Sequence, residues 1–148
     1  MEPILSFTGR YGFMSNFVDS PVFLDGEVYW TVEHAFQAAK SLDPAVRQRV
    51  RLQETPGEAK QAGRRVALRA DWEVVKEDVM LYLLQQKFSQ EPFRKWLLAT
   101  GDAHLEEGNT WGDRYWGVCP VGSGSGQNRL GVLLMQVRDE LRRQDVIA

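Results

Sequence analysis

The chain of 148 residues is long enough for one domain with its own hydrophobic core. Its 18 Lys and Arg residues nearly balance its 20 Asp and Glu residues, which excludes general attraction of the surface to nucleic acid or an anionic membrane. The only cysteine, Cys119, excludes an intramolecular disulfide, and the N-terminus lacks the basic start and apolar run of a signal peptide. We therefore expect one cytoplasmic domain over residues 1–148, with no membrane span.

The first third of the chain predicts a small antiparallel sheet followed by a helix. Residues 22–24 and 28–29 flank Asp25-Gly26, a pair whose tolerance of positive φ suits a tight hairpin turn. Thr31 is placed to cap a helix whose apolar residues keep the spacing of one buried face. These apolar residues are Val32, Ala35, Phe36 and Ala39.

Capping residues predict the later helices. Asp43-Pro44 starts one helix, and Thr55 with Pro56 and Glu58 starts the next. Asp71 caps a long helix that runs to about residue 88. Pro92 opens another helix, and Gly101 stops it in a left-handed conformation. The class is therefore α+β, a predominantly helical single domain with a small antiparallel sheet.

The last helix follows an irregular segment, residues 102–127. Asn128 is the expected cap, and Arg138, Arg142 and Arg143 suit the negative end of the helix dipole. An apolar stripe marks the buried face. The stripe comprises Leu130, Leu133, Leu134, Val137 and Leu141.

One polar ridge of the first helix is a candidate for chemistry. Glu33, Gln37 and Lys40 follow at i, i+4 and i+7, so a carboxylate, an amide and an ammonium share one stripe. Spacing alone favours a solvated helix face with weak Glu–Lys support, and an active-site ridge is the alternative. His34 is interpreted as a packed, hydrogen-bonded residue rather than a catalyst.

The irregular segment holds the second concentration of polar groups. Trp111 and Asp113 are spaced to stack a base and present a carboxylate to its ribose, or they form a turn pinned by a half-buried Trp. Residues 122–126 are rich in glycine and either cradle a phosphate at the start of the last helix or form a flexible lid. Trp96 is expected in the core, whereas Trp72 is open between core and base platform.

A basic stretch lies over two of the predicted helices. Nearby acids favour a solvated surface there, with one or two members left to hold phosphate. No His/Cys cluster has metal-ligand spacing, so we expect neither a metal nor a cofactor. The stretch comprises Arg47, Arg49, Arg51, Lys60, Arg64 and Arg65.

Six ordered motifs between about Phe7 and Arg138 resemble the NADAR, or YbiA-like, family. The resemblance implies a helical α+β domain and cleavage of N-glycosidic bonds. It implies two substrate classes: phosphoribosylamino-pyrimidine intermediates of riboflavin synthesis, which release ribose 5-phosphate, and ADP-ribose on guanine in nucleic acid. The motifs are Tyr11-Gly12-Phe13-Met14-Ser15-Asn16-Phe17, Thr31 to Lys40, Ala59 to Arg64, Arg69-Ala70-Asp71-Trp72-Glu73, Trp111-Gly112-Asp113 and Asn128-Arg129-Leu130-Gly131.

The resemblance also implies site residues. Glu33 matches the acidic catalytic residue, and we add Asp113 and Lys40 as candidates for the proton of the leaving group. The expected substrate contacts are Ser15, Asn16, Phe17, Phe36, Gln37, Arg64, Trp72, Asn109, Trp111, Gly112 and Asn128.

Cleavage of a ribosyl C–N bond builds positive charge on C1 and the ring oxygen, which a nearby carboxylate stabilises. We expect Glu33 to supply it or to activate water. A Schiff base between Lys40 and the opened sugar is the covalent alternative. The rival functions are an ADP-ribosyl-guanine hydrolase, with nucleic acid as partner, and a module that only binds ADP-ribose or NAD.

Overall fold

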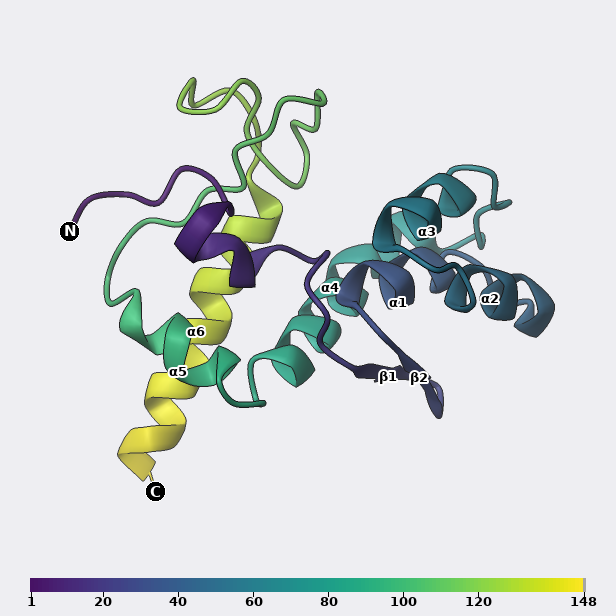
Figure 1. Cartoon of the computed structure of the whole chain (residues 1–148), viewed down its shortest axis with the longest axis horizontal. Helices are drawn as coiled ribbons and strands as arrows, with labels where there is room; N and C mark the ends of the chain where they lie inside the picture. The colour runs from purple at the N-terminus through teal and green to yellow at the C-terminus, as the bar shows by residue number, and fades with distance from the viewer. Residues whose placement is uncertain (148) are drawn as a thin grey trace. The chain divides into compact units, whose positions relative to one another are not determined.

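The computed structural model describes residues 1–147, a predominantly helical α+β chain with a small antiparallel sheet (Figure 1). This confirms the predicted class. Within the described part of the chain, no helix combines the length and the apolar character needed to cross a membrane. The elements are the 3-10 helix η1 (Gly9–Met14), β1 (Val22–Leu24), β2 (Glu27–Tyr29), α1 (Val32–Ala38), α2 (Pro44–Arg51), α3 (Pro56–Gly63), α4 (Trp72–Lys87), α5 (Phe93–Ala99) and α6 (Arg129–Ile147).

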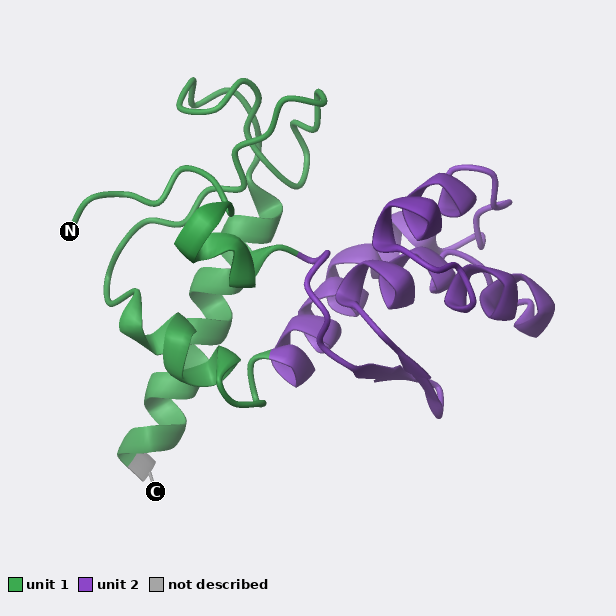
Figure 2. Cartoon of the chain, in the orientation of Figure 1, with its two compact units in different colours: residues 1–15, 88–148 green, residues 16–87 purple. Residues whose placement is uncertain are grey.

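The chain divides into two compact units, coloured separately in Figure 2. Unit 2 is the continuous segment 16–87 and holds the hairpin with α1 to α4. Unit 1 joins residues 1–15 to the chain from residue 88 onward and holds η1, α5 and α6. One domain over the whole chain stays a prediction.

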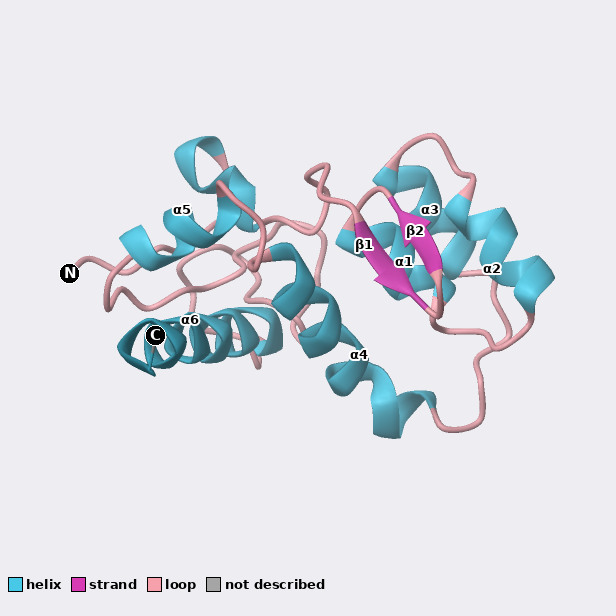
Figure 3. Ribbon diagram, turned by 90° about the horizontal axis from the view of Figure 1, so that it is seen from below, coloured by secondary structure: helices cyan, strands magenta, loops and turns pink. Residues whose placement is uncertain are grey.

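The hairpin of unit 2 forms where the sequence predicts it (Figure 3). Asp25 and Gly26 turn the chain with φ of +48° and +85°, as a two-residue hairpin loop requires. Val22 pairs with Tyr29, and both side chains are buried where β1 and β2 pack on α1. The Gln86 carboxamide of α4 pairs with both backbone polar groups of Phe23 at 2.8 Å, which covers the edge of the sheet.

Side-chain caps start the next three helices as expected. The Thr31 hydroxyl accepts from the His34 N–H, and the Asp43 carboxylate accepts from the N–H of residue 45. Thr55 accepts from the Glu58 N–H at 3.1 Å. The His34 ring contacts the Thr31 hydroxyl at 2.7 Å and the carbonyl of residue 53 at 2.9 Å, so the prediction of a packed, hydrogen-bonded histidine is confirmed.

Helix α4 begins directly after Asp71, as predicted, and an arginine links its start to the end of α1. The Arg69 guanidinium donates to Asp71 at 2.6 Å, and the Arg69 N–H donates to the Lys40 carbonyl at 2.8 Å. The same guanidinium reaches the carbonyl of Ala39 at 3.5 Å. These contacts satisfy carbonyls at the end of α1, which its own helix leaves without partners.

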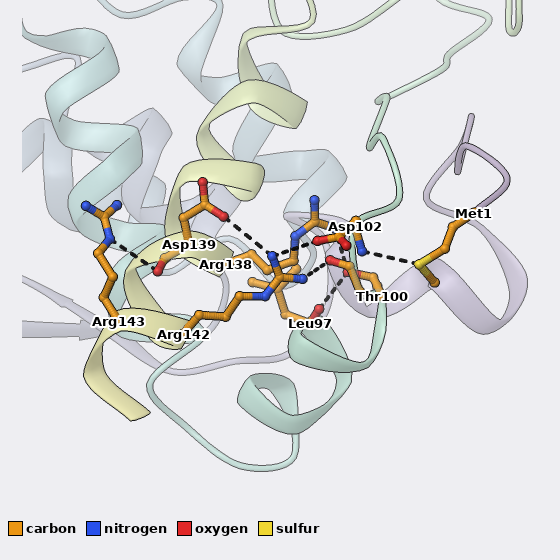
Figure 4. A network of polar contacts seen from close by, with 9 residues as sticks. Met1, Leu97, Thr100, Asp102, Arg138, Asp139, Arg142 and Arg143 are labelled. Atoms are coloured by element: carbon orange, nitrogen blue, oxygen red, sulfur yellow. Dashed lines mark hydrogen bonds and ion pairs between the residues drawn. The ribbon is translucent and has the colours of Figure 1, made fainter. Parts of the chain in front are cut away.

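The C-terminal arginines of unit 1 have a different role from the one expected. Arg138 is buried and donates to the Thr100 hydroxyl at 2.9 Å, while Arg142 donates to the Gly101 carbonyl and to Asp102 (Figure 4). Both arginines thus hold the chain just after α5. Because α6 continues to Ile147, none of the three predicted arginines lies in its last turn, and the dipole prediction is wrong. Gly101 has φ of +63°, the left-handed stop that the sequence predicts.

Two predictions of buried residues in unit 1 have opposite outcomes: one concerns the apolar stripe of α6 and the other Trp96. The apolar stripe of α6 is buried, as expected. Trp96, however, is 44% exposed and contacts the rings of Phe13 and Phe93 at 5.6 and 6.0 Å between centroids. The core assignment of Trp96 is wrong because helical spacing identifies a face without showing how fully its partners cover it.

Candidate active site

Helix α1 is buried along its whole length, including its polar residues. It packs against α2, α3, α4 and both strands, so it has no solvated side. Glu33 is 7% exposed and Gln37 6% exposed, while Lys40 just beyond the helix is half-buried. The interpretation of this ridge as a solvated face is therefore wrong, and its polar groups lie inside unit 2.

Two contacts hold Glu33 in place. Its Oε1 accepts a hydrogen bond of 2.8 Å from Gln37 Nε2, one turn along α1. Its backbone N–H, at the helix start, donates to the Asn16 carbonyl at 3.1 Å. The Asn16 amide in turn donates to the sulfur of Met80 on α4 at 3.6 Å. The Asn16 carbonyl thus supplies a partner for a backbone donor at the start of α1 that the helix itself leaves unpaired.

Two opposing effects act on the ionisation of Glu33, namely its burial and the positive charges nearby. Burial raises the pKa of the Glu33 carboxyl, because an ionised group loses solvation there. The hydrogen bond from Gln37 and the charges of Lys60 and Lys40 act in the opposite direction. Burial also lowers the pKa of Lys40, against the attraction of Glu33 and together with repulsion from Arg64 and Lys60.

Aromatic residues of unit 2 fall into two groups. Phe17 is 42% exposed, and the Lys60 ammonium lies 6.0 Å from the centre of its ring. Trp72 and Phe36 are each 5% exposed and pack with their ring centres 5.1 Å apart. Trp72 therefore supports α1 from α4 in this structure, which favours the core side of the open interpretation of that residue.

In unit 1, the loop of residues 109–113 is organised by its own side chains. Asn109 is buried, donates to the Asp113 carbonyl at 2.8 Å and accepts from the Asp113 N–H at 3.0 Å. Oδ1 of Asp113 accepts from the backbone N–H groups of Tyr115 and Trp116 at 3.0 and 2.9 Å. Gly112 turns the chain with φ of +87°, and Trp111 is 58% exposed. One oxygen of Asp113 is thus committed to holding the loop.

The backbone donors at the start of α6 are already engaged. The N–H groups of residues 127 to 130 donate to carbonyls of residues 114 to 117. A phosphate cradle at this point could therefore not use the N–H groups of residues 127 to 130, and the choice between cradle and lid for residues 122–126 stays a prediction. Asn128 directly precedes α6, but its side chain accepts from the Glu107 N–H and donates to the Leu105 carbonyl at 3.0 and 2.8 Å. The expected cap instead fixes the loop of residues 105–107.

Gly126, in the segment before α6, yields a stability prediction. A Cβ there would lie 2.2 Å from the Gly117 carbonyl oxygen, and φ is +149°. We expect Gly126→Ala to lower the free energy of unfolding by about 2 kcal/mol or more, measured by denaturant titration. Gly124→Ala is the control because φ is +73° but nothing lies within 4 Å, so only backbone strain of about 1 kcal/mol is added. Equal losses in the two variants would contradict the close-contact explanation.

A cavity of about 310 Å³ lies between α2 and α3 and contains none of the predicted site residues. Its acidic lining residue, Glu58, is exposed at a helix start, and Arg49, Val50 and Arg65 line other parts. Glu33 is more deeply buried than Glu58, and a desolvated carboxylate stabilises a sugar cation more strongly than an exposed one. Among the described residues, no three metal-binding side chains lie together as a potential metal site.

The predicted site residues divide between the two units. Glu33, Gln37, Lys40, Asn16 and Arg64 belong to unit 2, with Phe17, Phe36 and Trp72. The others belong to unit 1. Ser15 is the last residue of its first segment, and its second segment contains Asn109, Trp111, Gly112, Asp113 and Asn128.

Sequence reasoning missed two contributors. The sequence places Lys60 in a basic stretch that is mostly solvated, with one or two members left for phosphate, whereas in the structure its charge favours the ionised form of Glu33. Gly63 lies against Gln37. Lys60 and Gly63 both belong to the motif from Ala59 to Arg64, and this motif is the sequence feature that could have identified them as site residues.

Comparisons with known proteins agree with this fold. The chain is 46% identical to N-glycosidase YbiA of Escherichia coli strain K12 over 139 residues, which cover 92% of this chain and 85% of that protein. It is 35% identical to riboflavin biosynthesis protein VVA0006 of Vibrio vulnificus over 136 residues, 90% of this chain and 36% of that longer protein. The NMR structure of E. coli YbiA matches with a TM-score of 0.84 and 42% identity, covering 99% of this chain and 89% of that one.

A family model matches most of the chain. The NADAR domain model matches residues 6–142, a range that runs through both units. Together with the high identity to YbiA, this match establishes that the chain belongs to the NADAR domain family.

Proposed function

We propose that this protein is an N-glycosidase that hydrolyses the C1–N bond of a phosphoribosylamino-pyrimidine and releases ribose 5-phosphate. The observation that carries the proposal is a carboxylate, Glu33, buried among cationic side chains and held by an amide. The name of the E. coli relative, an N-glycosidase, supports the reaction class. The name of the Vibrio relative, a riboflavin biosynthesis protein, supports the pyrimidine substrate.

The buried position of Glu33 suits a carboxylate that must stabilise a developing positive charge. As the C1–N bond breaks, positive charge develops on C1 and the ring oxygen, and a carboxylate fixed nearby lowers the energy of that state. The interaction is strong at a buried site because little water screens it. The oxygen of a water molecule then bonds to C1, and one of its protons is released.

The departing nitrogen needs a proton, and we assign that proton to Lys40. Its half-buried ammonium has a lowered pKa, which makes it a better acid than an exposed lysine. Asp113 is the weaker candidate because its Oδ1 already accepts two backbone N–H groups. We assign the ribose phosphate to Lys60 and Arg64 of the α3 region, since the N–H groups of residues 127 to 130 at the start of α6 already donate to carbonyls.

The direct test is a mass-spectrometric screen of candidate ribosides with the purified protein. We expect loss of a phosphorylated pyrimidine riboside and appearance of free base with ribose 5-phosphate. Turnover of ADP-ribosyl-guanine oligonucleotides alone would replace this substrate by the nucleic-acid alternative. Tight binding of ADP-ribose without release of reducing sugar would overturn the assignment as an enzyme. Borohydride trapping of a sugar on Lys40 would replace direct hydrolysis by the Schiff-base route.

We predict that the activity survives exhaustive chelation. Hydrolysis through a sugar cation uses a carboxylate and a proton donor, and both are supplied here by side chains. The measurement is the rate of base release before and after dialysis against EDTA, with kcat retained within about twofold. Loss of activity that one divalent ion restores would contradict the proposed mechanism.

A further inference from the structure

Gly63 lies at a close approach between α3 and α1. A Cβ built on this residue would come within 1.9 Å of Gln37 Oε1 and 2.7 Å of Gln37 Cδ. The three nearest heavy atoms all belong to the Gln37 side chain. Even the smallest side chain at position 63 would therefore displace the Gln37 carboxamide, while the backbone of α1 is not among these closest contacts.

The Gln37 carboxamide uses its two ends differently. Its nitrogen donates to Glu33 Oε1 at 2.8 Å. Its oxygen is buried without a hydrogen-bond partner among the described residues and faces Gly63. Burying an amide oxygen without a partner is unfavourable. In this orientation, however, the amide nitrogen is directed at the Glu33 carboxylate. Because this oxygen is covered, it is poorly placed to contact substrate.

We propose that Gly63 and Gln37 form a positioning pair, in which the missing side chain of Gly63 leaves the space that lets the Gln37 amide hold the Glu33 carboxylate. The proposal rests on the proposed function of Glu33 and deepens it. It also revises the role of Gln37 from the expected substrate contact to a positioning residue. Neither residue takes part in bond making or breaking.

The pair has an electrostatic consequence for Glu33. The charged form of Glu33 is opposed by burial and favoured by the Gln37 hydrogen bond, by Lys60 on α3, and by Lys40 and His34 from α1 and its end. Without this hydrogen bond, less interaction favours the charged form against the effect of burial, so the pKa of Glu33 rises further. Because the ionised form is required, the acidic limb of the pH–rate profile then moves to higher pH.

Gly63→Ala is the first test, with Gly57→Ala as matched control. Both glycines lie in α3, but a Cβ at position 57 meets only the Thr55 hydroxyl oxygen, at 3.9 Å. We expect Gly63→Ala to lower kcat about 10- to 100-fold and to move the acidic limb upward, because small displacements at a reacting centre have effects of this size. Gly57→Ala should keep both the rate and the pH profile.

The double variant separates positioning from simple damage to α3. Gln37→Ala alone should reproduce the loss in kcat and the shift of the limb without any change in α3. In the Gln37→Ala background, Gly63→Ala should cause no further loss, because the side chain it would displace is absent. Additive losses, or a Gly63→Ala variant with the wild-type pH profile, would overturn the proposal.

A readout without substrate distinguishes this proposal from the proposed function. The carboxyl resonance of Glu33, labelled with ¹³C and assigned through Glu33→Gln, reports its titration directly. We expect its midpoint to rise in Gly63→Ala and in Gln37→Ala, but not in Gly57→Ala. If the midpoint moves in this way but Glu33→Gln is fully active, the positioning pair stands and the catalytic role of Glu33 fails. An unchanged midpoint refutes the pair, whatever the activity.

Discussion

Glu33→Gln is expected to lose about 100-fold or more in kcat while keeping the native fold. The substitution keeps the size of the side chain and an oxygen that accepts from Gln37, so the hydrogen bond of 2.8 Å is preserved. It removes the negative charge on which stabilisation of the sugar cation depends. The measurement is single-turnover release of base from the phosphorylated riboside, which reports the chemical step without product release.

The stability of the same variant supplies an internal control. A carboxyl whose pKa is raised on folding destabilises the native state when ionised, so the cost is present above its folded pKa and disappears at lower pH. Glu33→Gln should therefore raise Tm at neutral pH, by about 3 °C if the relief is on the order of 1 kcal/mol. The exposed acid Glu58 of α3 provides the matched variant Glu58→Gln, which should keep full activity. A Glu33→Gln enzyme with more than half of the wild-type kcat would remove Glu33 from the mechanism.

Removing the phosphate from the ribose is expected to lower kcat/KM by about 100-fold or more, with a smaller effect from changes at a distant position of the base. Contacts to a non-reacting group position the scissile bond, and part of their energy lowers the barrier. Ribose alone offers no charge to the cations beside Glu33. Paired kinetic measurements on phosphorylated and dephosphorylated ribosylamino-pyrimidines give the ratio directly.

Substitution of the cations tests where the phosphate binds. In Lys60→Met and Arg64→Met, the preference for the phosphorylated substrate should shrink, because the variant has lost the group that recognises the phosphate. Arg65→Met is the control, since Arg65 is exposed and lines the separate cavity between α2 and α3. A preference that persists in all three variants would place the phosphate elsewhere, and equal cleavage of both substrates would exclude an anion site.

Local chemistry made several parts of unit 2 predictable. The hairpin follows from Asp25-Gly26, whose positive φ values few other pairs tolerate. The starts of α1, α2 and α3 follow from Thr31, Asp43 and Thr55, whose side chains accept from backbone donors two or three residues ahead. Each of these features is decided within a few residues, so the sequence window contains its cause.

Features decided by distant packing were predicted poorly. Nothing near Glu33 in the sequence shows that α3, α4 and the strands cover the polar side of α1, which makes a solvated ridge and a buried site look alike. A phosphate cradle at the start of α6 needs free donors there, but the N–H groups of residues 127 to 130 donate to carbonyls of residues 114 to 117. Trp96 has helical spacing typical of a core residue, yet its cover depends on how aromatic neighbours from other segments are placed. The site residues implied by the family resemblance stay predictions until variants are assayed.

The order in which the two units can form during synthesis follows from their connectivity. Unit 2 is continuous, so all of its residues have been made once the ribosome has passed residue 87. Unit 1 needs partners from both ends of the chain, such as the Ile4 N–H that donates to the His104 carbonyl at 2.8 Å. Bringing these two ends together is slow when a long flexible segment lies between them. If that segment has already folded as unit 2, less conformational entropy is lost when the ends meet. The part that carries Glu33 can thus be complete on a nascent chain while residues 1–15 still wait for their partners.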